Sequence, residues 1–196
     1  MKKLIISILI ITFAFIVLLF FLIRYKNKNS VPKIPTNISK ELISTEEKPN
    51  ISMDSPDGKA TLTMRTTIDK NLITYAFNTN NLIYVKTTTK NDIFSIPFNT
   101  WSPDKNYVFV KENNTGVINF LVLNASGIAF RNGSQFINVN EIFNEKLPNY
   151  LLQDATGWAS GTLLIVNTNN KDGSTGPSFW FDVPSQTFIL LSIRFN

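Results

Sequence analysis

The chain has 196 residues and a formal charge of +5, and it contains no cysteine and no histidine. This composition excludes a thiolate nucleophile, an imidazole base, a disulfide bond and a zinc site of the usual Cys/His type. The length allows one domain of about 150 residues, or two very small ones.

The positive charge belongs to the amino-terminal end of the chain. Residues 1–29 contain five basic and no acidic residues, whereas residues 50–196 contain 11 basic and 11 acidic residues. Binding of nucleic acid depends on a basic patch that neutralises phosphates. The neutral main region therefore argues against nucleic acid as a partner.

Residues 4–23 form an apolar run in which Ser7 and Thr12 are the only polar members. As a helix, this run would span about 30 Å, which is the thickness of the hydrocarbon core of a bilayer. It exceeds the apolar core of a cleaved signal peptide, and basic residues rather than small ones follow it. We therefore predict an uncleaved transmembrane signal anchor over residues 1–25.

The orientation of this anchor rests on a weaker argument, because basic residues flank both of its ends almost equally. Only three residues precede the apolar run, so nearly all of the chain lies on one side of it. We expect a single-pass protein of the cell membrane with a cytoplasmic amino terminus and an extracytoplasmic carboxy-terminal domain.

Residues 26–51 combine Asn, Ser, Thr, Lys and Glu with three prolines and show neither a helical nor a strand period. Proline removes a backbone donor and disfavours helix in the preceding residue. We predict a flexible linker over 26–51, followed by a folded domain over 52–196.

The folded region alternates β-branched or aromatic residues with polar ones, and turn-forming pairs interrupt it. This pattern is typical of antiparallel strands. The predicted strands are 60–67, 71–77, 82–88, 93–98, 107–111, 117–123, 135–139, 162–168, 178–183 and 187–193. A short helical turn is expected at 140–146, within a region that otherwise interrupts the strands.

A weak internal repeat precedes three of these strands. Its repeat turns are Ser55-Pro56-Asp57-Gly58-Lys59 and, 47 residues later, Ser102-Pro103-Asp104-Lys105 after Trp101; a degenerate third copy begins at Trp158, 57 residues after Trp101. Pro presets φ, Asp bonds its own backbone, and Gly adopts the left-handed conformation that closes a tight turn. These turn residues are expected to be structural, with the preceding aromatic filling the contact between neighbouring sheets.

The aromatic-Ser-Pro-Asp-Gly-Lys cassette resembles the repeats of TolB-type periplasmic β-propellers and of prolyl-oligopeptidase-like propellers. This resemblance implies an all-β fold of antiparallel, propeller-like repeats, with about three four-stranded blades behind one transmembrane helix. Closed propellers contain about 4 to 8 blades. The blades are therefore expected to form an incomplete ring, which a homo-oligomer could complete, or a compact stack. The peptidases' catalytic motif is absent from the sequence, so the resemblance carries over no active site.

Three tryptophans are the candidate contacts with a ligand or partner. Trp101 and Trp158 could line a carbohydrate-binding face, although Trp beside a repeat turn is more often a core residue. Trp180 lies in a strand with aromatic residues on both faces, so it is either buried between layers or exposed to a partner.

We expect neither a metal nor a cofactor. The segment 167–176 around Asp172 is faintly similar to a calcium loop, but Thr168 replaces the first acidic ligand and Phe179 the bidentate Glu. A long hairpin turn is the favoured interpretation.

The sequence thus favours a non-enzymatic interaction or scaffold module of the cell envelope, which holds an envelope protein or polymer. The alternative is a module that binds a glycan or small ligand through exposed Trp. A hydrolase of unknown type is the third hypothesis. It comes last because the sequence shows no nucleophile motif.

Overall fold

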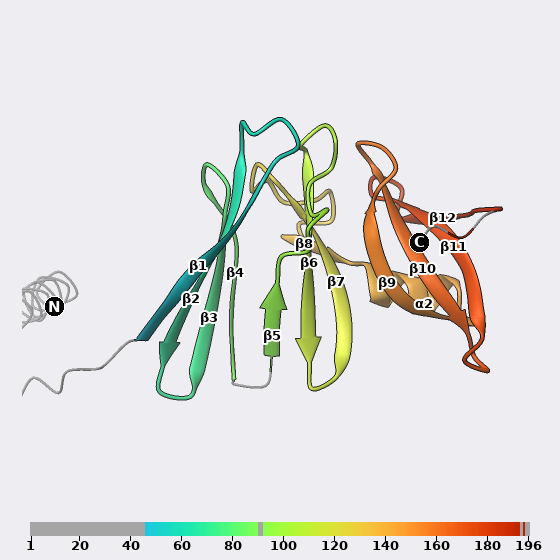
Figure 1. Ribbon diagram of the computed structural model, residues 1–196, viewed down its shortest axis with the longest axis horizontal. Coiled ribbons are helices and arrows are strands. Elements are labelled where there is room, and N and C mark those ends of the chain that lie inside the picture. Colours follow the sequence, from blue (N-terminus) through green and yellow to red (C-terminus); the bar gives the residue numbers. More distant parts are fainter. Residues whose placement is uncertain (1–45, 90–91, 193, 195–196) are drawn as a thin grey trace, which may run out of the picture. The chain divides into compact units, whose positions relative to one another are not determined.

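The computed structural model describes residues 46–89, 92–192 and 194 (Figure 1). The predicted anchor at residues 4–23 and most of the predicted linker lie outside these residues. Within the described ranges, no helix is both long and apolar enough to cross a membrane.

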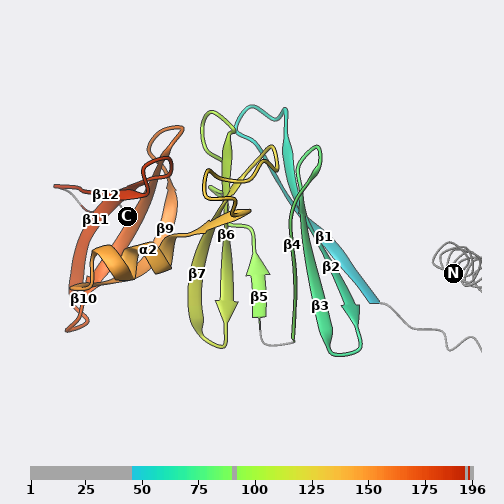
Figure 2. The ribbon, with the colours of Figure 1, turned by 180° about the vertical axis from the view of Figure 1, so that it is seen from behind.

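The described chain forms three four-stranded antiparallel sheets, each with its strands in chain order (Figures 1 and 2). Sheet 1 contains β1 (Glu46–Asp54), β2 (Thr61–Asp69), β3 (Leu72–Asn78) and β4 (Leu82–Thr89). Sheet 2 contains β5 (Asp92–Ser95), β6 (Tyr107–Asn114), β7 (Val117–Asn124) and β8 (Phe136–Asn138). Sheet 3 contains β9 (Tyr150–Trp158), β10 (Leu163–Asn170), β11 (Thr175–Asp182) and β12 (Thr187–Leu190). The predicted all-β, antiparallel class is confirmed.

Strand β1 was not predicted. It occupies the last six residues of the expected linker and the start of the expected domain. Pro49 weakens the strand pattern there, since proline donates no ladder hydrogen bond. The structure accommodates Pro49 because β1 is an edge strand with a register shift between Lys48 and Ile51. Residues 46–51 therefore belong to sheet 1 and not to a linker.

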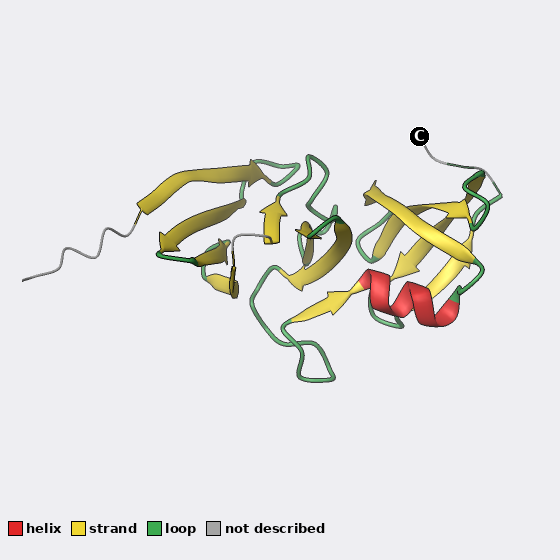
Figure 3. Cartoon of the chain, turned by 90° about the horizontal axis from the view of Figure 1, so that it is seen from below, coloured by secondary structure: helices red, strands yellow, loops and turns green. Residues whose placement is uncertain are grey.

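The segment between sheets 2 and 3 also differs from the prediction. The expected helical turn at 140–146 is a helix, α2 (Val139–Lys146), whose first turn is capped by the Asn138 side chain. No strand was predicted between residues 139 and 162, but β9 begins at Tyr150 within this stretch. Figure 3 shows α2 running beside sheet 3.

Alternating side chains of sheet 2 pack in opposite directions, as strand geometry requires. Val108 and Val110 lie in a hydrophobic cluster with sheet 1, whereas Phe109 lies in a second cluster with sheet 3. We call these two contacts joint 1 and joint 2. Sheet 2 is thus buried on both faces, and sheets 1 and 3 each keep one face directed away from it.

Helix α2 takes part in joint 2. Val139 and Phe143 are fully buried, and the Phe143 ring lies 5.2 Å from Phe188 and 6.2 Å from Phe179 between ring centroids. Helix α2 therefore supplies part of the core between sheets 2 and 3.

Candidate functional site

The first two repeat turns have the same internal hydrogen bonds. Ser55 Oγ donates to Asp57 Oδ1 at 2.8 Å and accepts from the Ala60 amide at 3.0 Å. In the second turn, Ser102 Oγ donates to Asp104 at 2.7 Å and accepts from the backbone amide five residues later at 3.0 Å. The serine and aspartate side chains of each turn thus bond within the turn itself.

The left-handed position of the turn is also conserved in geometry between the two copies. Gly58 has φ of 69°, and Lys105, 47 residues later, has φ of 63°. The second copy therefore adopts the same turn without the glycine. The third copy is shorter: the Ala159 amide donates to the Leu163 carbonyl at 2.8 Å, which closes the turn after Trp158.

The tryptophan before the second turn and the tryptophan before the third turn each connect a sheet to the preceding one. Trp101 Nε1 donates to the Met53 carbonyl at 3.0 Å across joint 1. Trp158 Nε1 donates to the Thr100 carbonyl at 3.1 Å across joint 2. Met53 and Thr100 are again 47 residues apart, so the two joints use one rule: the indole binds the carbonyl just before the preceding repeat turn.

These contacts show what the predicted Trp101 and Trp158 do in the fold. Trp101 is only 6 % exposed, and Trp158 stacks on Tyr107 with ring centroids 6.2 Å apart. Both indole N–H groups are occupied by main-chain carbonyls. The core interpretation therefore accounts for most of each side chain, and only part of Trp158 remains available to a ligand.

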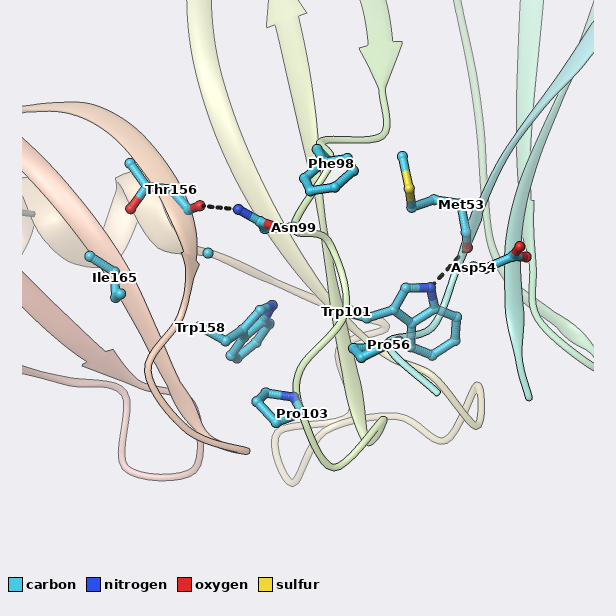
Figure 4. A pocket seen from close by; sticks show the side chains of 11 residues that line it. Met53, Asp54, Pro56, Phe98, Asn99, Trp101, Pro103, Thr156, Trp158 and Ile165 are labelled. Carbon is cyan, nitrogen blue, oxygen red and sulfur yellow. Dashed lines mark hydrogen bonds between the residues drawn. The ribbon is translucent and has the colours of Figure 1, made fainter. Parts of the chain in front are cut away.

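The two tryptophans nevertheless line one cavity of about 590 Å³ (Figure 4). Further lining comes from β1 and the turn after it, from the segment between β5 and β6, and from β9 and β10. The residues are Met53, Asp54, Pro56, Phe98, Asn99, Pro103, Thr156, Gly157 and Ile165. The cavity therefore draws residues from all three sheets.

Phe98 is a residue of this cavity that the sequence did not identify as a candidate. Its side chain is 83 % exposed, the highest value among the large apolar residues of the described chain. It also lines a second cavity of about 400 Å³, which includes Lys111, Phe120 and Asp154. An exposed aromatic ring thus stands between two hollows.

The wall beside Phe98 is held in place by a contact between sheets 2 and 3. Asn99 Nδ2 donates to the Thr156 carbonyl at 3.2 Å. At Gly157, a Cβ atom would lie 3.1 Å from the Asn99 Cβ, so the glycine permits this close approach. Asp54 also borders the cavity, and its carboxylate accepts from Thr61 Oγ1 at 2.7 Å.

The repeat turns of sheets 1 and 2 are joined by charge. Lys105 Nζ lies 2.6 Å from Asp57 Oδ2, and both side chains are about one third exposed. This ammonium group, followed by the Ser55 hydroxyl, holds the pKa of Asp57 well below its usual range. A lowered pKa suits a permanently charged, structural carboxylate, whereas a general acid needs a raised one.

A second ion pair lies inside joint 1. Lys86 of β4 pairs with Glu112 of β6, whose side chain is 6 % exposed, and the Lys86 ammonium lies 5.7 Å from the centroid of the Phe94 ring. Burial, followed by the charge of Glu112, raises the pKa of Tyr84 to about 12. The ion pair thus links β4 of sheet 1 to β6 of sheet 2.

Trp180 lies on the opposite face of sheet 3 from its two strand neighbours. Its strand neighbours Phe179 and Phe181 are buried in joint 2, whereas Trp180 lies on the face of sheet 3 that points away from sheet 2. Its indole Nε1 is buried and has no hydrogen-bond partner in the described part of the chain.

The loop around Asp172 is the predicted hairpin turn, which connects β10 to β11. The Asp172 carboxylate accepts from the Ser174 amide at 2.9 Å and from the Ser174 hydroxyl at 2.6 Å, and these bonds lower its pKa. Gly173 adopts the left-handed conformation. Across residues 46–89, 92–192 and 194, no three acidic side chains cluster in a way that could hold a metal ion.

Comparisons with protein-family models, curated proteins and solved structures find no significant match to this chain.

Proposed function

We propose that the chain is a non-enzymatic interaction module of the cell envelope, anchored in the membrane by residues 4–23, and that the surface around Phe98 holds a protein or polymer of the envelope. The module acts outside the cytoplasmic membrane, and the three sheets correspond to three propeller-like blades in an incomplete ring. The resemblance of the repeat turns and the length of the apolar run support these two assignments.

The exposure of Phe98 is the observation that carries this proposal. An isolated exposed apolar side chain needs no explanation, but an aromatic ring between two cavities provides area for a partner. The strands β1, β5 and β9 beside these cavities each have only one hydrogen-bonded neighbour. An unpaired strand edge offers main-chain donors and acceptors to an extended segment. Phe98 would supply the apolar contact next to these edges.

A glycan or small ligand is the second candidate, and the cavity shared by Trp101 and Trp158 favours it. Asp54, Asn99 and the Thr156 main chain provide polar groups in the same place. The two indole N–H groups are already bonded, so such a ligand would have to use the remaining ring surface. We therefore place this candidate after the protein or polymer partner.

Site-specific photo-crosslinking in intact cells tests the proposal. A photoreactive residue replaces Phe98 in the full-length chain, and the matched control carries it at Val117, which is 62 % exposed and lines none of these cavities. We expect a discrete adduct from position 98 and none from position 117. Equal labelling at the two positions would contradict the proposal.

Two further measurements separate the parts of the proposal. Phe98→Ala should leave the free energy of unfolding within about 0.5 kcal/mol of the wild type, because an exposed side chain contributes little to the core. Protease treatment of intact cells should remove the folded region. A region that survives until the membrane is broken would place it in the cytoplasm and refute the orientation, even if the crosslink at position 98 persists.

A further inference from the structure

The two outward faces of the described chain are chemically different, and this difference points to a second binding surface. On sheet 1, hydroxyl groups pair across the strands of the outward face: Ser52 with Thr63 at 3.0 Å and Thr74 with Thr87 at 2.9 Å between oxygen atoms. Such a face is satisfied by itself and by water. In repeat proteins, a polar outer face of this kind is typical of a terminal, capping unit.

The residue that would join sheet 1 to a preceding sheet is also missing. Asp54 stands 47 residues before Trp101, at the position where a tryptophan makes the joint. Its carboxylate binds the Thr61 hydroxyl of its own sheet. An acidic side chain offers neither the indole N–H nor the ring that fills joints 1 and 2, so sheet 1 ends the array on its side.

Sheet 3 keeps the pattern of a joint on its outward face. Ile165, Trp180 and Ile189 lie opposite one another across β10, β11 and β12. The corresponding row of sheet 2 consists of Phe109, Val122 and Ile137. In sheet 2 this row is at most 3 % exposed because sheet 3 covers it, whereas Ile189 is 46 % exposed.

The indole of Trp180 lies in the middle of this row. Its N–H is buried without a partner among the described residues, and a buried, unpaired donor is costly in a folded protein. Arg194 closes one end of the same face, where its guanidinium donates to the Thr168 and Gly176 carbonyls, each at 2.7 Å. The row beside it retains the apolar composition of a contact between sheets.

We propose that the outward face of sheet 3 docks a β-sheet of another protein, which covers Ile165, Trp180 and Ile189 with apolar side chains. The two internal joints support this occupant, because in both of them a sheet covers the equivalent row. A second copy of the chain is disfavoured, since Asp54 replaces the joint tryptophan of sheet 1 and hydroxyl groups pair across its outward face. This surface meets the cavity beside Phe98 at Ile165, which lines that cavity as well.

An extended chain tests whether the face accepts a sheet. The full-length protein receives, after residue 196, a second copy of residues 139–192, which contains every residue that packs sheet 3 and α2 into joint 2. We expect hydrogen exchange at the Ile189 backbone amide and at the Trp180 indole N–H to become at least tenfold slower. Unchanged exchange at both groups would overturn the proposal.

Two variants show whether the added sheet docks on this face. One variant replaces by alanine the tryptophan of the added copy that corresponds to Trp158, which makes the joint. The other variant is Ile189→Lys in the original sheet. Each should abolish the protection. The Ile189 side chain is nearly half exposed, so this variant should fold, and its unfolding curve checks that. Protection that survives Ile189→Lys would place the added sheet elsewhere and refute the inference.

Sedimentation of the unextended chain decides between the two possible occupants. We expect its mass to be that of a monomer at concentrations up to about 100 µM, which is a typical range for weak non-obligate contacts. A dimer that Ile189→Lys dissociates would assign the face to a second copy and overturn the choice of another protein. Loss of the Phe98 crosslink would affect the proposed function but not this result.

Discussion

Replacing each tryptophan by phenylalanine distinguishes the two tryptophans that connect sheets, Trp101 and Trp158, from Trp180. In Trp101→Phe and Trp158→Phe a ring remains, but the N–H···O bonds of 3.0 and 3.1 Å across the joints are lost. A buried hydrogen bond contributes about 1 kcal/mol net, and the smaller ring loses about 1 kcal/mol of apolar contact. We expect each variant to lower the free energy of unfolding by about 2 kcal/mol, and by similar amounts, because the two contacts are equivalent.

Trp180→Phe is the matched control, because it removes a buried N–H that has no partner in the described structure. The loss of an unpaired donor should offset the loss of ring area, so we expect a change of less than about 0.5 kcal/mol in either direction. Urea unfolding followed by far-UV circular dichroism measures all three variants without depending on tryptophan fluorescence. A cost for Trp180→Phe as large as for Trp158→Phe would refute the assignment of the joints.

Three further predictions concern the turns and joint 1. Gly58→Ala should destabilise the protein by about 1 kcal/mol in urea unfolding, because the left-handed backbone is strained with a Cβ although no atom lies within 4 Å of it. Glu112→Gln should cost about 2 kcal/mol in the same assay, since it leaves the partly buried Lys86 ammonium without its counter-charge. The pKa of Asp57 is lowered by Lys105 in the folded state, so its contribution is present above about pH 4 and is lost as the pH falls further. The stability difference between wild type and Asp57→Asn should therefore shrink between pH 5 and pH 2.

The features that the sequence predicted correctly are those determined by short-range chemistry. The turn at Ser55-Pro56-Asp57-Gly58 closes through bonds between residues that are at most five positions apart. Its residue types are therefore sufficient to predict it, and a repeat of the same types at Ser102 predicts the same turn. The β-branched and aromatic residues at the start of β6 similarly predict a strand.

The strands that were missed are the edge strands β1 and β9. β1 contains Pro49 and is exposed along nearly all of its length, so neither propensity nor an apolar period marks it. β9 contains Gly157 and two register shifts against β10, which break the alternation. Both strands exist because a regular neighbour, β2 or β10, pairs with them, and a pairing between distant residues is invisible in a local pattern.

The candidate site was predicted in part for the same reason. The repeat indicated that Trp101 and Trp158 are equivalent, and the structure brings them to one cavity. The exposure of Phe98 could not be predicted, because nothing in its neighbours Pro97 and Asn99 distinguishes a surface phenylalanine from a core one. The position of the side chain depends on how sheets 2 and 3 meet at Asn99 and Thr156.

The two repeat intervals give the two joints different contents beyond their equivalent tryptophan contacts. The first interval, of 47 residues, adds no helix, so joint 1 is formed by sheets 1 and 2 alone. Their contact includes the ion pair of Lys86 and Glu112. The second interval, 57 residues, adds α2, so that Phe143 fills joint 2 with rings on both sides. Because each sheet contacts only its neighbours, the stability of such an array is approximately the sum of its units and joints. Joint 1, which contains the partly buried pair of Lys86 and Glu112 and receives no helix, should therefore open first under urea.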